Sequence, residues 1–154
     1  MLLRSIFHLD DITMSPVAQM TLRLRWNDPR LVFNAPNHEY LTLPSPARIW
    51  KADLFFANEQ SAHFHNILQP NVLTRIYPNG DVLMSLRLTL KFGCSMDLRM
   101  FPMDRQVCAI PLSSFGTTSK DVEIVWDTGD SIQPPHPIQL GFDVSMPRFR
   151  LVGV

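Results

Sequence analysis

Two segments of the chain alternate strictly between apolar and polar residues. In residues 20–26, apolar side chains separate Thr21, Arg23 and Arg25, and residues 84–92 show the same alternation. Successive side chains of a β-strand point to opposite faces, so each segment predicts a strand with one buried face and one wet face. This pattern is typical of antiparallel sheets, which commonly pack one face on the core.

A tight turn links the second of these segments to the apolar run before it. The pair Asn79-Gly80 lies between residues 72–77 and residues 84–92. Asn-Gly readily adopts the positive φ angles of a hairpin turn, so we expect the two flanking strands to pair directly. A short helical turn is expected near Asp28-Pro29-Arg30. Further strands are predicted over residues 2–9, 40–43, 52–56, 107–112, 122–126 and 148–152.

Composition supports a β-rich domain and excludes several classes of function. Many short strands at near-regular spacing indicate a sandwich or barrel, and the 13 prolines fall between apolar stretches. The 14 acidic and 14 basic residues cancel, so a nucleic-acid partner is not expected. No window reaches the ~18 apolar residues of a membrane span. Residues 1–11 lack the apolar core and cleavage site of a signal peptide.

Two cysteines, Cys94 and Cys108, enclose thirteen residues that include Phe-Pro-x-Asp in their second half. Taken alone they are either two unrelated buried thiols or a bridge. The stretch resembles the signature loop of the Cys-loop receptors. That resemblance implies a disulfide, which would stabilise the fold by about 3 kcal/mol. It also implies a gating loop in which Phe101 and Pro102 form a stiff apolar tip above Asp104.

Five further segments are similar to parts of this family, the first of them to its anion-selective branch. They cover residues 25–31, 49–59, 62–65, 113–118 and 146–149, and the whole resemblance runs from about residue 1 to residue 151. The family implies an all-β fold, a twisted immunoglobulin-like β-sandwich of about ten strands. It implies a homomeric or heteromeric ring of five subunits with agonist sites between neighbours. Neither enzymatic activity nor a cofactor is expected.

The resemblance also implies that residues 1–154 are an incomplete extracellular ligand-binding domain, truncated at both ends. The pore helices and a third principal binding loop are expected after residue 154, and an N-terminal helix before residue 1. A transmembrane domain would hold such a subunit in the plasma membrane, with this domain on the extracellular, postsynaptic side. Agonist binding would rearrange the sandwich, and the loop between the cysteines would transmit that change to the pore.

Five residues match agonist-contacting positions of invertebrate glutamate-gated chloride channels. Arg4 and Arg23 match two arginines on the first two strands, and Ser85 matches a serine on the same complementary face. Ser114 and Phe115 match the principal face. Glutamate carries two carboxylates, and the planar fork of arginine grips a carboxylate with two hydrogen bonds. The expected partner is therefore an amino-acid neurotransmitter, with glutamate favoured.

Other residues favour a glycine receptor. Phe115 stands where glutamate channels usually carry tyrosine, and residues 55–59 and 62–65 are also similar to glycine receptors. A phenylalanine face still attracts an ammonium group, by roughly 0.5–2 kcal/mol. A glycine- or GABA-gated subunit therefore remains an alternative. Without the family resemblance, Arg4 and Arg23 are expected to be solvated side chains on an open strand face.

A few features point away from further sites. His63 and His65 alternate along one segment, but two histidines without a nearby carboxylate or cysteine indicate surface residues, so no metal site is expected. Trp50 is expected in the core. Ala52 replaces the proline of the family's Trp-x-Pro-Asp segment, and residues 134–144 are longer than the family pattern. Both departures indicate a divergent subunit.

Three other classes of protein compete with a channel subunit. A soluble agonist-binding protein would have the same sandwich and ring without a pore. A secreted adhesion sandwich would leave the cysteine motif unexplained. An enzyme is disfavoured because Asp104, His63 and Ser114 lie in separate segments, without a nucleophile elbow or metal-ligand spacing.

Overall fold

The computed structural model describes residues 1–7, 9, 12–44, 48–127, 137–141, 144, 146 and 149–153. Strands dominate this part of the chain, which contains no α-helix. The strands are β1 (Leu2–Phe7), β2 (Val17–Asn27), β3 (Leu41–Leu43), β4 (Leu54–Phe56), β5 (Glu59–Phe64), β6 (Val72–Ile76), β7 (Asp81–Phe92), β8 (Leu112–Ser114) and β9 (Gln139–Leu140). Short 3-10 helices are η1 (Pro29–Leu31) and η3 (Leu98–Met100). The expected all-β class is confirmed.

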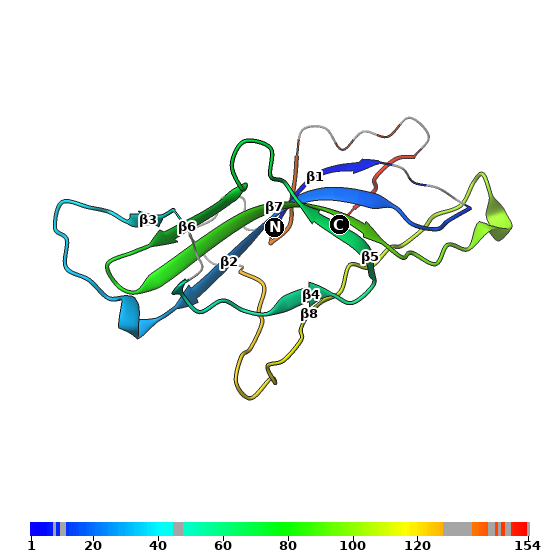
Figure 1. Ribbon diagram of the computed structural model, residues 1–154. Helices are drawn as coiled ribbons and strands as arrows, with labels where there is room; N and C mark the ends of the chain where they lie inside the picture. Colours follow the sequence, from blue (N-terminus) through cyan, green and yellow to red (C-terminus); the bar gives the residue numbers. More distant parts are fainter. Residues whose placement is uncertain are drawn as a thin grey trace.

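The strands form two layers. The main sheet has the order β3–β6–β7–β2–β1–β9, and β5 also pairs with β7. Its pairs are antiparallel except β1–β9, which is parallel. A second sheet consists of β4 and β8, which lie below β2 and β7 in the view of Figure 1. This arrangement confirms the predicted sandwich.

The core lies on one face of the two longest strands. Alternate residues of β7 are buried, and β2 contributes three neighbours that face the same way. Met20 and Leu90 are completely enclosed. Burying a side chain of this size stabilises the fold by about 1.5–3 kcal/mol. The buried apolar residues of these two strands are Ala18, Met20, Leu22, Val82, Met84, Leu86, Leu88, Leu90 and Phe92.

The predicted hairpin between β6 and β7 is confirmed. The two strands pair in register from Ile76↔Val82 to Val72↔Leu86. Gly80 has a φ of +85°, a conformation that L side chains rarely adopt. A Cβ atom at this position would lie only 2.7 Å from the carbonyl oxygen of Asp28, so the turn also needs glycine for space.

Several strand predictions were right, and others need correction. Strands occur within residues 2–9, 40–43 and 52–56, and the helical turn near Pro29 is η1. Of residues 107–112 only Leu112 lies in a strand, β8; before it, the carbonyl of Ala109 accepts from the side chain of Asn58 and that of Pro111 accepts from the N–H of Ala57. Residues 122–126 find no pairing strand among the described residues. Residues 149–152 form no strand either, and 148 lies outside the described residues.

Two strands were missed. β5 begins with polar residues, yet it pairs with β7 from Glu59↔Phe92 to Phe64↔Leu88. Pairing with a strand that is already formed outweighs the weak strand propensity of such residues. β9 lies within residues 134–144, the segment that departs from the family pattern, and pairs with Leu2 and Leu3.

Trp50 does not lie in the core as expected. It is 42% exposed and packs edge-on against Trp26, with ring centroids 5.9 Å apart. Its indole therefore covers Trp26 rather than filling the space between the sheets. No helix in the described part of the chain is long and apolar enough to cross a bilayer.

Candidate functional site

The polar face of the main sheet brings three of the predicted ligand-contact residues together. Arg23 on β2 stands directly opposite Ser85 on β7. Arg4 lies at an irregularity in the β1–β2 pairing, between Leu3 and Ser5. Its Nε donates to Oγ1 of Thr21 at 2.8 Å, which holds Arg4 against the strand that carries Arg23. Three neighbouring strands thus supply Arg4, Arg23 and Ser85.

A hydrogen-bond network continues along the same face. Arg87 donates from Nη2 to Oε1 of Gln19 at 2.7 Å. Nε2 of His65 lies 3.4 Å from Nε2 of Gln19 and 2.8 Å from Oγ1 of Thr89. The β2–β7 register places Thr21 opposite Arg87. The network therefore holds Arg87 in the row of residues next to Arg23 and Ser85.

Positive charge accumulates on this face. Arg4, Arg23 and Arg87 form no ion pair with a carboxylate of the described residues, where such pairs involve Arg25, Arg30 and Arg99. Burial lowers the pKa of His65, and the nearby charges of Arg87 and Arg4 lower this pKa further. The lowered pKa favours the neutral imidazole beside these two cations. Unpaired guanidinium groups on a sheet face attract anions.

The second sheet carries a carboxylate clamp that sequence analysis missed. Oδ1 of Asp53, just before β4, accepts hydrogen bonds from the hydroxyls of Ser114 at 2.6 Å and Thr117 at 3.0 Å. Oδ2 accepts from the backbone N–H of Gly116. The Ser114 hydroxyl, followed by the Gly116 N–H, lowers the pKa of Asp53. Asp53 therefore fixes the loop that follows β8.

This clamp leaves the ring of Phe115 exposed. Its backbone N–H donates to the carbonyl oxygen of Asp53 at 3.1 Å, while 85% of the residue is accessible. The ring packs edge-on against Phe55, with centroids 6.0 Å apart. Such a presentation leaves an aromatic face open to a cation. The Ser114 hydroxyl donates to Asp53, and its oxygen accepts the N–H of Thr117 at 3.2 Å, so little of its hydrogen-bonding capacity is left for a ligand.

The predicted residues form two groups in a single chain. Arg4, Arg23 and Ser85 lie on the main sheet, whereas Ser114 and Phe115 lie on or beside β8 in the other sheet. No hydrogen bond or ring contact of the described residues joins the two groups. The two groups therefore lie on different sheets of the sandwich.

Cys94 and Cys108 form a disulfide, with Cα atoms 5.2 Å apart. The loop that they close extends from one end of the long axis of the molecule, opposite β3 (Figure 1). Its tip is apolar and exposed to solvent, since Phe101 is 59% and Met103 is 89% exposed. Pro102 is exposed beside them.

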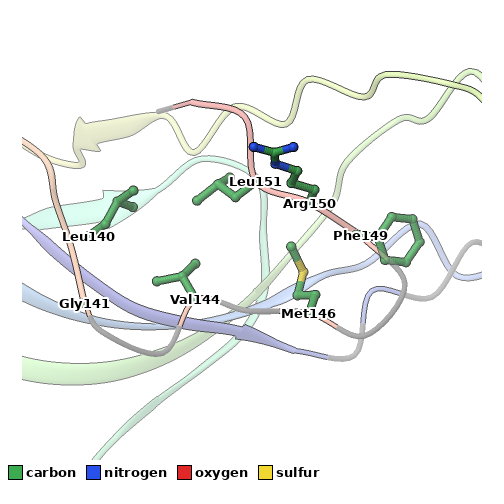
Figure 2. A pocket seen from close by; sticks show the side chains of 7 residues that line it. All are labelled: Leu140, Gly141, Val144, Met146, Phe149, Arg150 and Leu151. Carbon is green, nitrogen blue, oxygen red and sulfur yellow. The ribbon is translucent and has the colours of Figure 1, made fainter.

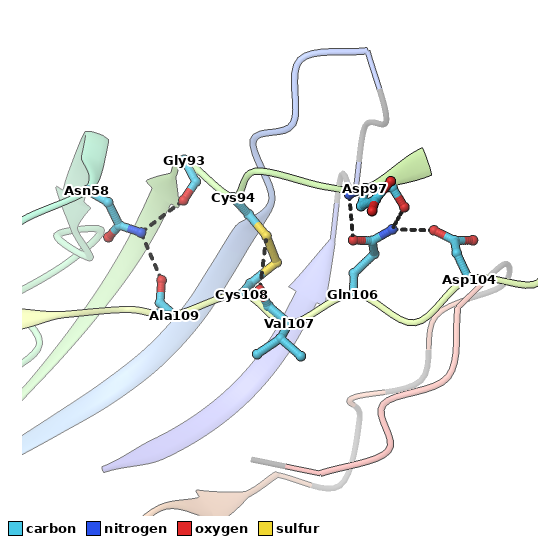
Figure 3. Close-up of a disulfide and its surroundings, with 9 residues drawn as sticks. All are labelled: Asn58, Gly93, Cys94, Asp97, Asp104, Gln106, Val107, Cys108 and Ala109. Carbon is cyan, nitrogen blue, oxygen red and sulfur yellow. Dashed lines mark hydrogen bonds between the residues drawn. A yellow bond between two sulfur atoms is a disulfide. The ribbon is translucent and has the colours of Figure 1, made fainter. Parts of the chain in front are cut away.

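Gln106 braces the inside of this loop. Its Oε1 accepts from the N–H of Asp97 at 3.0 Å, and its Nε2 donates to the carbonyl of Asp97 at 2.8 Å (Figure 3). The same Nε2 contacts Oδ2 of Asp104. Asp104 is therefore held from the side, through a residue that sequence analysis did not single out.

One hollow opens at the C-terminal end of the described chain (Figure 2). None of the five predicted ligand-contact residues lines it. Among the described residues, no three histidine, cysteine, aspartate or glutamate side chains gather as metal ligands would. The hollow is lined by Leu140, Gly141, Val144, Met146, Phe149, Arg150 and Leu151.

A β-sandwich with a fifteen-residue disulfide loop at one end and an arginine-rich polar face defines a class of ligand-binding receptor domain. The family model described as the neurotransmitter-gated ion-channel ligand binding domain matches residues 1–149. The chain therefore belongs to this family. The match confirms the resemblance of the cysteine loop and its flanking segments.

Curated relatives come from the anion-channel branch. A "Glutamate-gated chloride channel" of Drosophila melanogaster is 43% identical over 150 residues, covering 96% of this chain and 32% of the relative. "Glycine receptor subunit beta" of Rattus norvegicus and of Homo sapiens are each 42% identical over 135 residues, covering 85% of this chain and 27% of the relative. The chain thus spans about a third or less of these relatives.

Proposed function

We propose that residues 1–154 are part of the extracellular ligand-binding domain of a neurotransmitter-gated chloride channel subunit that responds to glutamate. The subunit forms a ring of five and lies in the plasma membrane with this domain outside, on the postsynaptic side. The family match and the similarity to a glutamate-gated chloride channel support this proposal. Proteins of this kind bind and gate, so no enzymatic step is assigned.

The observation that carries the proposal is the pair of arginines on adjacent strands. Arg23 faces Ser85 across the β2–β7 ladder, and Arg4 is held beside β2 by Thr21. Two guanidinium groups without carboxylate partners in the described residues suit the two carboxylates of glutamate, with Ser85 as a further donor. This face is the complementary side of the site.

The principal side comes from the neighbouring copy. There the exposed ring of Phe115 attracts the agonist ammonium group, and Asp53 keeps the loop of Ser114 and Phe115 in shape. The disulfide loop with Phe101, Pro102 and Asp104 transmits the change caused by binding. Its exposed apolar tip lies at one end of the molecule, where a second domain can touch it.

A glycine-gated subunit is the second candidate. Phe115 lacks the hydroxyl of a tyrosine, and two curated relatives that cover most of the chain are glycine receptor subunits. Glycine has one carboxylate, so Arg23 alone would satisfy it and Arg4 would have no ligand role. The two candidates therefore differ in what Arg4 does.

Recordings from the full-length subunit at controlled surface density test the proposal. We expect chloride currents with glutamate at lower concentration than with glycine or GABA. Removing one partner of a desolvated charge pair costs about 2–5 kcal/mol, so Arg23→Ala should raise the half-maximal glutamate concentration at least tenfold. Arg23→Lys keeps the charge but loses the fork, and should weaken the response less.

Arg4→Ala separates the two agonists. A large loss of glutamate potency supports the glutamate site, whereas an unchanged glycine response with no glutamate response supports the second candidate. Arg48→Ala, at an exposed position before β4, is the control for loss of an arginine that belongs to neither the polar face nor the disulfide loop. An Arg23→Ala channel that reaches the surface and responds normally would contradict the proposed site.

A further inference from the structure

The side chain of Asn58 joins the two chain segments at the base of the disulfide loop. Asn58 follows β4 in the turn that leads to β5. Its Nδ2 donates to the carbonyl oxygens of Gly93 at 2.9 Å and Ala109 at 2.8 Å (Figure 3). Because Gly93 precedes Cys94 and Ala109 follows Cys108, one amide group spans both segments just outside the disulfide.

The chemistry of the amide is fully specified by these contacts. An asparagine amide nitrogen carries two hydrogens, and each of them has an acceptor here. The reversed orientation would turn Oδ1 towards two carbonyl oxygens, which is repulsive. The carbonyl of Asn58 also accepts the N–H of Gly93 at 2.9 Å, which makes a third hydrogen bond to the base of the loop.

The geometry demands a specific residue at this position. Oδ1 of Asn58 is buried and has no hydrogen-bond partner among the described residues. An unsatisfied buried acceptor is costly, by about 1–3 kcal/mol. The side chain is therefore kept in place by the two hydrogen bonds that Nδ2 donates, since Oδ1 gains no hydrogen bond there.

The turn that carries Asn58 is joined through β4 to β8, the strand that leads to the principal side of the proposed agonist site. The N–H of Ala57 donates to the carbonyl of Pro111 at 3.0 Å, next to the start of β8. β4 pairs with β8 from Phe56↔Leu112 to Leu54↔Ser114. A short path thus runs from the loop held by Asp53, along β4 and β8, to the base of the disulfide loop.

We propose that Asn58 is a positioning residue that couples the β4–β8 pair to the disulfide loop and thereby sets how efficiently bound agonist opens the channel. The inference rests on the proposed function. No hydrogen bond of the described residues joins Asn58 to a predicted agonist-binding residue, so it acts on the opening step and leaves agonist contact unchanged. A ligand shifts an equilibrium between two states only through groups whose contacts differ between them.

The decisive variant is Asn58→Asp in the full-length receptor. It keeps the shape of the side chain but replaces two donors with an oxygen facing two carbonyls. We expect the opening equilibrium to fall about tenfold, in line with the cost of unpairing buried polar groups. The maximal response to a partial agonist should drop relative to a full agonist, while the affinity of a competitive antagonist stays within about twofold.

Controls separate coupling from folding. Asn37→Asp makes the same chemical change at an exposed turn residue before β3 and should leave all responses unchanged. If Asn58→Asp fails to reach the cell surface, Asn58→Gln keeps the amide on a longer side chain and should give an intermediate loss of efficacy. A role in folding alone would lower surface density but would not change the ratio of partial to full agonist responses.

A second measurement does not depend on gating. The disulfide of the full-length Asn58→Asp protein should be reduced faster by a water-soluble thiol than that of the wild type, because the base of the loop is no longer joined. Unchanged agonist efficacy at normal surface density would overturn the inference, and so would equal losses of antagonist and agonist affinity. A wild-type receptor that responds to no amino acid would overturn the proposed function. Faster reduction of the disulfide in Asn58→Asp would still support the role of Asn58 in joining the base of the loop.

Discussion

His65 is the residue whose ionisation the fold controls most directly on the polar face. Burial lowers its pKa first, and the charges of Arg87 and Arg4 lower it further. The folded chain therefore binds a proton less readily than the unfolded chain. Below the pKa that His65 has in the unfolded chain, protonation therefore favours the unfolded chain. The free energy of unfolding falls as the pH falls through this range.

The free energy of unfolding of the chain should therefore decrease on acidification from about pH 6.5, the ordinary histidine pKa. Urea unfolding followed by tryptophan fluorescence at several pH values measures this. His65→Gln should flatten the pH dependence, because glutamine can fill the space without ionising. His63→Gln, on the exposed part of the same segment, is the matched control and should leave the slope as in the wild type.

Residue by residue, the polar face was only partly predictable. Alternation placed Arg23 and Ser85 on the wet sides of their strands, and the structure sets them opposite each other. The contact between Arg87 and Gln19 could not be foreseen, because it depends on the register of strands 68 positions apart in sequence. The same is true of the Asp53 clamp. The agonist roles of these residues remain predictions.

Among the elements, the β6–β7 hairpin depends most on a single residue. Gly80 adopts a positive φ, and a Cβ atom there would meet the Asp28 carbonyl at 2.7 Å. The N–H of Asp28 donates to the carbonyl of Gly80 at 2.9 Å, so the turn also holds the end of β2. A left-handed conformation costs an L residue about 1–2 kcal/mol, before any clash.

Gly80→Ala should therefore lower the free energy of unfolding by at least about 1–2 kcal/mol. The midpoint of urea unfolding of the purified chain reports the loss. Gly153→Ala is the control, since a Cβ atom at that position meets nothing within 4 Å. Equal midpoints for Gly80→Ala and the wild type would show that the turn tolerates a side chain, against the geometry described above.

The elements differed in how readily sequence predicted them. β2 and β7 are long and buried on one face, so their alternation is unmistakable. β5 is largely exposed and forms only because β7 offers hydrogen-bonding partners. Residues 122–126 are rich in β-branched and aromatic side chains without becoming a strand, and Val125 and Trp126 remain 72% and 53% exposed. Local pattern alone cannot supply a pairing partner.

At the scale of the whole molecule, the separation of the two residue groups is decisive. Arg23 and Ser85 lie on the main sheet, whereas Phe115 follows β8 in the other sheet. In the proposed site, agonist contacts both groups, and each of two neighbouring copies supplies one of them. Rings of identical chains are built from such head-to-tail interfaces.

Co-expression of two defective full-length subunits tests this arrangement. Arg23→Ala removes the complementary side and Phe115→Ala the principal side, so each variant alone should respond only at much higher agonist concentration. In mixed rings, roughly a quarter of the interfaces would combine an intact Phe115 with an intact Arg23. A component of normal agonist sensitivity should therefore reappear on mixing. Its absence, with both subunits at the surface and shown to co-assemble, would place both residues in the same copy's site or in none.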